Sequence, residues 1–478
     1  MNHNMFNLWK IPLNVVMHSF RLSAGKNIYL SAVKPKDLLY NVMVMNKTIF
    51  TNKSKLLLFC AVLGAVSGAV LWVFLRVVHL GTVLLWEKLP EIVDVPVWYP
   101  VVVCTLGGVI IGLFRKRFGD YPQTMKTVIG TVKRTGTYPY NKIVVILIAA
   151  ALPLIFGSSV GPEAGMVGVL VALGCWANEN LKFAKKNADF YSSVGMAVSL
   201  SILFYSPLFG FFSAVEREDD LPTDGGKTSS CKADSDTSPN SDGNLDRSAK
   251  LLIYGISIAS ALSVLSLLNH LFGKVSEGFP SFGNAQPDKW DFLMMVVYII
   301  CGILLGLFFE KSEELLAKLS GKLPPVLSEV VAGLILGGTV SFLPVLQFSG
   351  ESQMSVLITD YARYAPVAMI GIAFLKVLLT NLCIQMGLKG GHFFPLIFAA
   401  VCLGYGISLL VFPMDAEYAV FAAAITTAAT MSVSIRKPLA VTCLLFLCFP
   451  VKMGLWIFLA AILAGQVTRS KKHEAKTQ

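Results

Sequence analysis

Long apolar segments alternate with short polar or glycine-rich interruptions from residue 56 to residue 467. An α-helix needs about 20 apolar residues to cross the ~30 Å hydrocarbon core of a bilayer, and several segments reach that length. They are too long for the alternating ~10-residue strands of a membrane β-barrel. The pattern therefore predicts an all-α, polytopic membrane protein whose first two crossings are residues 56–79 and 97–114.

One long polar segment divides this apolar region. Residues 218–249 are rich in Asp, Ser and Gly and contain almost no large apolar side chains, which is typical of a solvated linker. We expect a basic N-terminal extension (1–54), a first membrane repeat (55–217), an acidic soluble linker (218–249), a second membrane repeat (250–470) and a basic tail (471–478). The comparable lengths of the two apolar halves suggest an internal repeat.

Each apolar half contains a segment that glycine and proline interrupt. The interruption reads GSSVGPEAG (157–165) in the first half and GLKGGHFFP (387–395) in the second. Irregular backbone inside a bilayer must face protein or a water-filled cavity, because each unpaired peptide group costs several kcal/mol in hydrocarbon. Paired interruptions of this kind indicate two inverted-topology repeats whose broken helices meet at a midplane binding site.

A helix that begins directly after such an interruption presents unpaired N–H groups and the positive end of its dipole, which favour an anion. Glu163 follows Gly161 and Pro162 and is the only charged side chain between Lys142 and Glu179. Its carboxylate would compete with an external anion for the same helix terminus. We therefore expect Glu163 to be a gate or a proton-coupling group, the alternative being an ordinary helix-start acid near the surface.

Composition and charge narrow the class of protein further. The chain is 55% hydrophobic and 14% charged, with a mean hydropathy of +0.66, whereas soluble domains carry roughly 25% charged residues. This excludes a water-soluble enzyme. The net charge of +11 could indicate nucleic-acid binding, but the basic residues lie beside apolar segments, as in residues 1–54 and 115–142. The positive-inside bias then places both termini in the cytoplasm, with membrane lipid and no nucleic acid as a partner.

The nine cysteines give no sign of a metal site or a disulfide framework. None is part of a C-x-x-C pair, and most lie inside apolar segments, where cysteine is a small core side chain. We therefore expect neither a metal nor another cofactor.

Four segments carry a specific set of motifs. They are residues 155–169 (IFGSSVGPEAGMVGV), 206–216 (SPLFGFFSAVE), 373–400 (AFLKVLLTNLCIQMGLKGGHFFPLIFAA) and 435–440 (IRKPLA). In content and order they resemble segments of the CLC family of chloride channels and anion/proton antiporters, with Glu163 at the place of the family's gating glutamate. The resemblance implies a homodimer with one anion pathway per subunit.

The same resemblance implies three anion sites along each pathway. By position, the anion-binding residues would be Gly119 and Asp120 at the inner site, Gly391, His392 and Phe393 at the central site, and Gly161 and Ala164 at the outer site. At the inner site FGDYP (118–122) replaces the family's G-S-G-x-P, so the anion-coordinating serine is missing. The position of the inner proton-transfer glutamate falls on Arg217, which makes Glu216 and Glu218 candidates for a proton relay. Neither a terminal pore-tyrosine segment nor a pair of CBS nucleotide-binding domains is expected.

The functional hypothesis is transmembrane transport of chloride or a similar small inorganic anion, by a channel or a proton-coupled exchanger rather than an enzyme. A second hypothesis is an inverted-repeat carrier for another small anionic solute. A third is an intramembrane serine hydrolase, because residues 157–161 satisfy G-x-S-x-G around Ser159, with His392 as a distant partner. The apolar helical context disfavours the hydrolase. Simpler roles are expected for the side chains near the interruptions. Ser158 and Ser159 could face a neighbour, but helix capping is the favoured role; His392 is expected to be packed or to face outward, and Lys376 to snorkel or to pair within the bundle.

Overall fold

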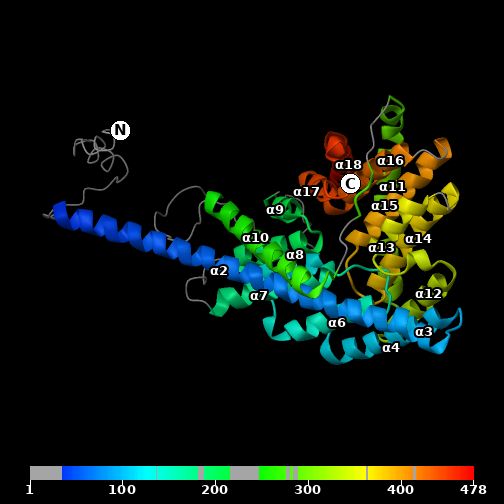
Figure 1. Ribbon diagram of the computed structural model, residues 1–478, viewed down its shortest axis with the longest axis horizontal. Coiled ribbons are helices and arrows are strands. Elements are labelled where there is room, and N and C mark those ends of the chain that lie inside the picture. The colour runs from blue at the N-terminus through cyan, green and yellow to red at the C-terminus, as the bar shows by residue number, and fades with distance from the viewer. Residues whose placement is uncertain are drawn as a thin grey trace. The chain divides into compact units, whose positions relative to one another are not determined.

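The computed structural model describes residues 35–135, 137–180, 188–215, 247–275, 280–283, 289–361, 364–412 and 416–477 (Figure 1). The chain divides into two units, residues 1–56 and 57–478, and the features described below, apart from the first part of one helix, belong to the second. Across the described ranges the structure is helical and contains no β-strand, which confirms the predicted all-α class.

The described elements before residue 216 include the first interruption, which lies between α6 and α7. They are α2 (Pro35–Val83), the π-helix η2 (Leu84–Lys88), α3 (Leu89–Val93), α4 (Tyr99–Phe118), α5 (Met125–Thr135), the 3-10 helix η3 (Tyr140–Lys142), α6 (Ile143–Ile155), α7 (Glu163–Asn180), α8 (Ala188–Leu203) and α9 (Pro207–Val215). Helix α2 is longer than the predicted crossing at residues 56–79. It continues on both sides because residues 36–89 contain no proline that would remove a backbone donor.

The described elements after residue 246 include the second interruption, which lies between α14 and α15. They are α10 (Arg247–Phe272), α11 (Lys289–Ser320), α12 (Leu327–Phe342), η4 (Pro344–Leu346), α13 (Glu351–Asp360), α14 (Pro366–Gln385), α15 (Phe393–Val411), α16 (Ala416–Ile435), α17 (Pro438–Leu445), η6 (Val451–Met453) and α18 (Gly454–Thr477). Six described helical segments are long and apolar enough to cross a membrane: Leu57–Val93, Leu251–Phe272, Lys289–Ser320, Pro366–Gln385, Phe393–Val411 and Glu417–Ile435. This confirms a multi-pass membrane protein.

The packing order of the helices repeats. Helices α6, α7, α8 and α9 contact one another consecutively, and α14, α15, α16 and α17 do the same. Helix α10 packs on α8 and α9, just as α18 packs on α16 and α17. Corresponding elements also contact each other, as α4 does α12 and α9 does α17. When two repeats are related by an approximate two-fold axis, an element beside the axis contacts its own counterpart from the other repeat.

Glycines allow the close contact between α4 and α12. A Cβ atom at Gly108 would overlap the carbonyl oxygen of Glu329, and one at Gly333 would overlap the carbonyl oxygen of Cys104. Small residues are typical of helix interfaces in membranes because they let two backbones approach. The contact matters for the site because it places the end of α4 beside the start of α12.

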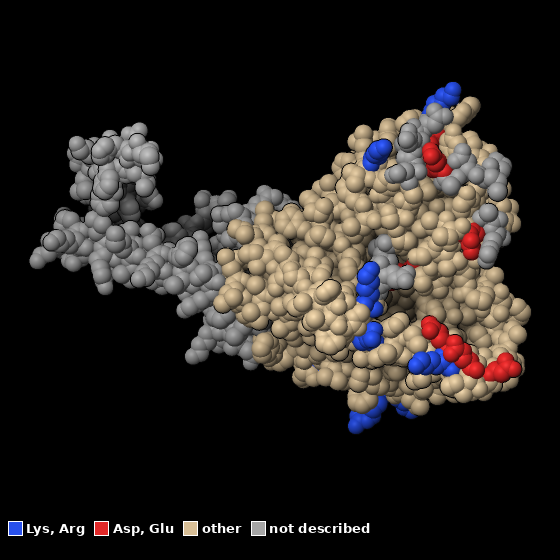
Figure 2. Space-filling view, in the orientation of Figure 1, with Lys and Arg blue, Asp and Glu red and all other residues tan. Residues whose placement is uncertain are grey.

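Burial distinguishes the innermost helices from the outer ones. The apolar windows of α15 and α16 are each 83% buried, whereas that of α10 is 33% buried. Large apolar side chains such as Ile92 and Phe342 are 79% and 85% exposed, as expected where a helix faces lipid. Figure 2 shows that uncharged residues cover most of the described surface on the face in view, with the charged side chains in a few groups. The helix that follows the second interruption therefore lies in the core.

Candidate anion-conducting site

The two interruptions end their preceding helices in the same way. Helix α6 ends at Ile155 and α14 ends at Gln385, and each is followed within two residues by a glycine with positive φ. These are Gly157 (φ +80°) and Gly387 (φ +105°), in the left-handed region that favours glycine. The following helices begin at Glu163 and Phe393. The structure thus confirms the pair of broken helices.

The two interruptions are joined directly by their backbones. The N–H of Gly161 donates to the carbonyl oxygen of Gly391 at 2.7 Å, and the N–H of Gly391 donates back to Gly161 at 2.6 Å. These hydrogen bonds satisfy the irregular backbone inside the bundle. They also use the two N–H groups, so Gly161 and Gly391 do not present amide donors to an anion in this arrangement.

The Glu163 side chain extends from the first interruption to the second. It is 4% exposed, and its Oε1 accepts the backbone N–H of Phe394, in the first turn of α15, at 3.1 Å. A Cβ atom at Gly161 or Gly391 would overlap the carboxylate, which therefore fits only because both positions are glycine. Its Oε2 is buried with no hydrogen-bond partner. The carboxylate occupies the positive end of α15, whereas the sequence led us to expect competition at the start of its own helix.

The central residues expected to hold an anion lie at the same helix start. His392 is the N-cap of α15 and Phe393 is its first residue. Backbone N–H groups in the first turn have no acceptor within the helix, and Pro395 has no N–H. Ala164 lies correspondingly in the first turn of α7.

The side chains of the hydrolase hypothesis have separate hydrogen-bond partners. The Ser159 hydroxyl pairs with the Thr380 hydroxyl at 3.3 Å, while His392 Nε2 lies 3.3 Å from the hydroxyl oxygen of Ser434. The His392 ring is packed, with its centroid 5.0 Å from that of Phe309. This arrangement disfavours a Ser159–His392 couple.

Helix capping by the two serines is not observed. Helix α7 begins at Glu163, four residues after Ser159, which instead pairs with Thr380. Ser158 Oγ is buried without a hydrogen-bond partner. The capping interpretation was therefore wrong, because Gly161 and Pro162 delay the start of the helix beyond the reach of either hydroxyl.

Lys376 is fully buried rather than snorkelling. Its Nζ donates to the carbonyl oxygens of Leu346 at 2.9 Å and Phe348 at 2.7 Å, and it lies 5.5 Å from the centroid of the Phe398 ring. The lysine thus binds the backbone between η4 and α13 to the core.

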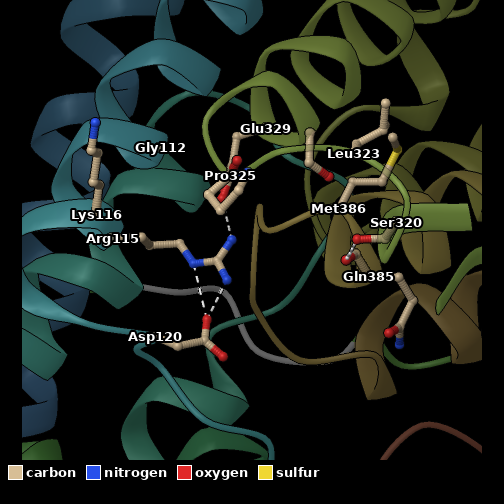
Figure 3. A pocket seen from close by; sticks show the side chains of 11 residues that line it. Gly112, Arg115, Lys116, Asp120, Ser320, Leu323, Pro325, Glu329, Gln385 and Met386 are labelled. Carbon is tan, nitrogen blue, oxygen red and sulfur yellow. Dashed lines mark hydrogen bonds and ion pairs between the residues drawn. The ribbon is translucent and has the colours of Figure 1, made fainter. Parts of the chain in front are cut away.

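The inner residues form a charged cluster that the sequence did not predict. Asp120 pairs with Arg115 at the end of α4 and, at 2.6 Å, with Lys389 in the second interruption. Arg115 also pairs with Glu329, in the first turn of α12. Figure 3 shows the Arg115 guanidinium between these two carboxylates, at the side of a cavity of about 390 Å³. A sequence signal was present, since Lys389 is the only charged residue of its interruption and requires a partner there.

The charges around Asp120 favour its ionised form. Partial burial raises the pKa of Asp120, but the hydrogen bond and charge of Lys389 and the charge of Arg115 together lower the pKa below its ordinary value. Gly119, beside it, has a φ of +101° and is the C-cap residue of α4. Glu216 and Glu218 lie outside the described residues.

This architecture defines a class of membrane protein in which two broken helices place their starts at one buried point. Residues 107–218 and 245–469 match the family model described as "Voltage gated chloride channel", and the match is interrupted within the expected linker. The chain therefore belongs to the voltage-gated chloride channel family, a family of channels and transporters.

Individual relatives are distant but extensive in coverage. The chain is 22% identical over 374 residues to "Chloride channel protein CLC-e" of Arabidopsis thaliana, covering 72% of this chain and 48% of that protein. It thus spans about half the length of the plant relative. It is 23% identical over 359 residues to "Putative ion-transport protein YfeO" of Escherichia fergusonii, covering 72% of this chain and 76% of that protein.

Solved structures share the fold. A CLC-type fluoride/proton antiporter superimposes with a TM-score of 0.67 at 17% identity, covering 87% of this chain and 96% of its own. A slow cyanobacterial Cl⁻/H⁺ antiporter gives a TM-score of 0.66 at 19% identity, covering 86% of this chain and 94% of its own. At these identities the likeness establishes the fold.

Proposed function

We propose that this protein moves chloride or a similar small inorganic anion across a membrane, as a channel or a proton-coupled exchanger gated by Glu163. The observation that carries the proposal is the buried Glu163 carboxylate, which accepts the N–H of Phe394 at the start of α15. A carboxylate and a small anion require the same donors at a helix start. Membership of the chloride channel family supports the same activity.

Gating follows from competition for that helix start. While Glu163 is in place, the positive end of α15 is neutralised and the path beside Gly161 and Gly391 is filled. An incoming anion, or protonation of the carboxylate, would release the side chain and free the N–H groups of Phe393 and Phe394. For proton coupling, Glu216 or Glu218 would carry the proton on the cytoplasmic side.

The anion path runs through the three predicted sites. Its residues are Gly119 and Asp120 at the inner end, Gly391, His392 and Phe393 at the centre, and Gly161 and Ala164 at the outer end. The two glycines contribute space rather than donors, because the N–H of each donates to the carbonyl oxygen of the other. The path therefore attracts anions with backbone dipoles at its centre and with charged side chains at its inner end.

The packing also refines the repeat boundaries that we propose. Because α10 relates to α8 and α9 as α18 relates to α16 and α17, the first repeat extends through α10 and the second begins at α11. The 218–249 linker then falls within the first repeat rather than between the expected repeats 55–217 and 250–470.

We further propose a homodimer in the cell membrane, surrounded by lipid, with both termini and the basic segments 1–54 and 471–478 in the cytoplasm.

Flux measurements on Glu163→Gln test this function. Purified protein in liposomes loaded with chloride, fluoride or nitrate should release anion, and the substitution should abolish proton movement while anion flux persists. Loss of a charge at a helix start is worth roughly 0.3–2 kcal/mol, so the Kd for the anion at this helix start should fall about two- to thirtyfold. Glu417→Gln is the matched control, because it removes an exposed acid from the first turn of α16. Wild-type protein that releases none of the three anions would sink the proposal, and a Glu163→Gln variant indistinguishable from wild type would remove Glu163 as the gate.

A further inference from the structure

Four charged side chains from distant parts of the chain form one cluster, and three of them, Arg115, Asp120 and Glu329, line the cavity of Figure 3. This charge cluster consists of Arg115, Asp120, Glu329 and Lys389. Arg115 Nε donates to Asp120 Oδ1 at 3.0 Å, Lys389 Nζ donates to Asp120 Oδ2 at 2.6 Å, and Arg115 Nη1 pairs with Glu329. The cluster contains two cations and two carboxylates, and each cation contacts Asp120.

The two carboxylates of the charge cluster differ in how firmly they are held. Glu329 has a side chain that is 2% exposed, and its Oε2 also accepts the N–H of Val326 at 2.8 Å, which fixes it to the start of α12. Asp120 has a side chain that is 59% exposed and lies on the short segment between α4 and α5. Asp120 is therefore the carboxylate that can leave without unfolding a helix terminus.

The cations would remain in place when Asp120 leaves. Arg115 stays paired with the buried Glu329, and this ion pair packs against Gly387, where a Cβ atom would overlap the guanidinium. Lys389 is held between Gly387 and Gly391 in the second interruption, four residues before Phe393. Departure of Asp120 would leave one net positive charge beside the proposed anion path, with Arg115 lining a cavity that can admit an ion.

Asp120 binds these cations as a small anion would. Its two oxygens are divided between the guanidinium and the ammonium group, with Oδ1 on Arg115 and Oδ2 on Lys389. Arginine and lysine are the side chains that proteins use to bind inorganic anions through charge-assisted hydrogen bonds. Glu163 occupies the start of α15 by the same kind of replacement, but there the donors are backbone N–H groups.

We propose that Arg115 and Lys389 form an anion-binding site for a small inorganic anion, and that Asp120 is a second carboxylate gate that fills this site when no anion is bound. The proposal rests on the proposed anion transport but concerns binding, which can be measured without flux. It gives the inner end of the path a charged gate, built from residues 269 positions apart in the sequence.

Equilibrium binding of chloride and nitrate to purified full-length protein tests the proposal. Removing the competing carboxylate in Asp120→Asn should lower the Kd for the anion about tenfold, a typical coupling between two groups that exclude each other. Asp120→Ser, which keeps a neutral hydrogen-bonding side chain, should give the same gain if the asparagine variant folds poorly. Adding Lys389→Gln to either variant should remove the gain. Adding Lys116→Gln should preserve it, because Lys116 lines the same cavity but points away from Asp120 in Figure 3.

Several outcomes would overturn the second gate. A folded Asp120→Asn or Asp120→Ser variant with the wild-type Kd would show that Asp120 does not compete with the anion. A gain that survives Lys389→Gln would place the binding elsewhere. Wild-type protein that binds anions in this manner but releases none from liposomes would contradict the proposed transport while leaving the binding site intact, so the two failures are distinguishable.

Discussion

Glu163 and Asp120 are two carboxylates that each occupy a positive site, but the sites are built differently. Glu163 is 4% exposed and is held by a backbone N–H at a helix start, whereas the Asp120 side chain is 59% exposed and is held by Arg115 and Lys389. A helix terminus provides partial charge without an ionisable donor, while two cationic side chains provide full charge that salt and anions can screen. For the proposed anion path, the difference suggests that the Glu163 site is the selective centre and that the Asp120 site is an inner entrance accessible to solvent.

The largest expected effect comes from filling the space that the Glu163 carboxylate occupies. A Cβ atom in Gly391→Ala would overlap that carboxylate, so the side chain must leave the start of α15. We expect the loss of proton movement with persisting anion flux that is expected of Glu163→Gln, and a loss of about 1–3 kcal/mol in unfolding free energy from overpacking. Flux assays and thermal unfolding measure the two effects.

The matched control for this substitution is Gly338→Ala. Gly338 lies in α12, and a Cβ atom there has no neighbour within 4 Å, so this variant should keep wild-type flux and stability. Combining Gly391→Ala with Glu163→Gln should add little to either change, since both act on one carboxylate. Fully additive effects on flux would separate Gly391 from the gate and weaken the comparison of the two carboxylates.

An intermediate effect concerns the pH range in which Asp120 remains paired. Its pKa in the folded protein lies below the ordinary value near 3.8, so its stabilising contribution is present above pH 3.8 and disappears as the pH falls through the lower folded value. The difference in melting temperature between wild type and Asp120→Asn should therefore stay constant from pH 7 to pH 5 and shrink only below about pH 4. Thermal unfolding across this range provides the measurement. A difference that already disappears between pH 7 and pH 5 would show that Lys389 and Arg115 do not hold Asp120 ionised.

The smallest effect is expected from Ser159→Ala. The serine loses one hydroxyl pair with Thr380, which is worth about 1 kcal/mol, and the Glu163 contacts are unchanged. Anion flux should therefore remain within about twofold of wild type, a change that corresponds to under 0.5 kcal/mol. A loss of flux comparable to that of a Glu163 variant would give Ser159 a direct role beside the gate.

Much of the fold could be predicted from local patterns. Segments of about 20 apolar residues indicate membrane helices, and the Gly157–Pro162 and Gly387–Gly391 regions interrupt two of them because glycine and proline favour irregular backbone. The sequence also singled out Glu163, since a lone charge in an apolar segment requires a partner, and the structure shows that partner to be the N–H of Phe394. The prediction that Ser158 and Ser159 cap a helix was wrong, because α7 begins only at Glu163, after Gly161 has paired with Gly391 of the second interruption.

What the sequence by itself determined is the class of protein: an all-helical membrane protein with paired interruptions and an isolated glutamate, because hydrophobic length and backbone conformational preference are local properties. Only the tertiary structure decided the partners. Glu163 meets Phe394, 231 residues away, Asp120 meets Lys389, and Gly161 and Gly391 use each other's N–H groups. Such contacts have no sequence period, because they arise when two distant repeats pack together and their charges and backbone donors must be satisfied inside one low-dielectric core.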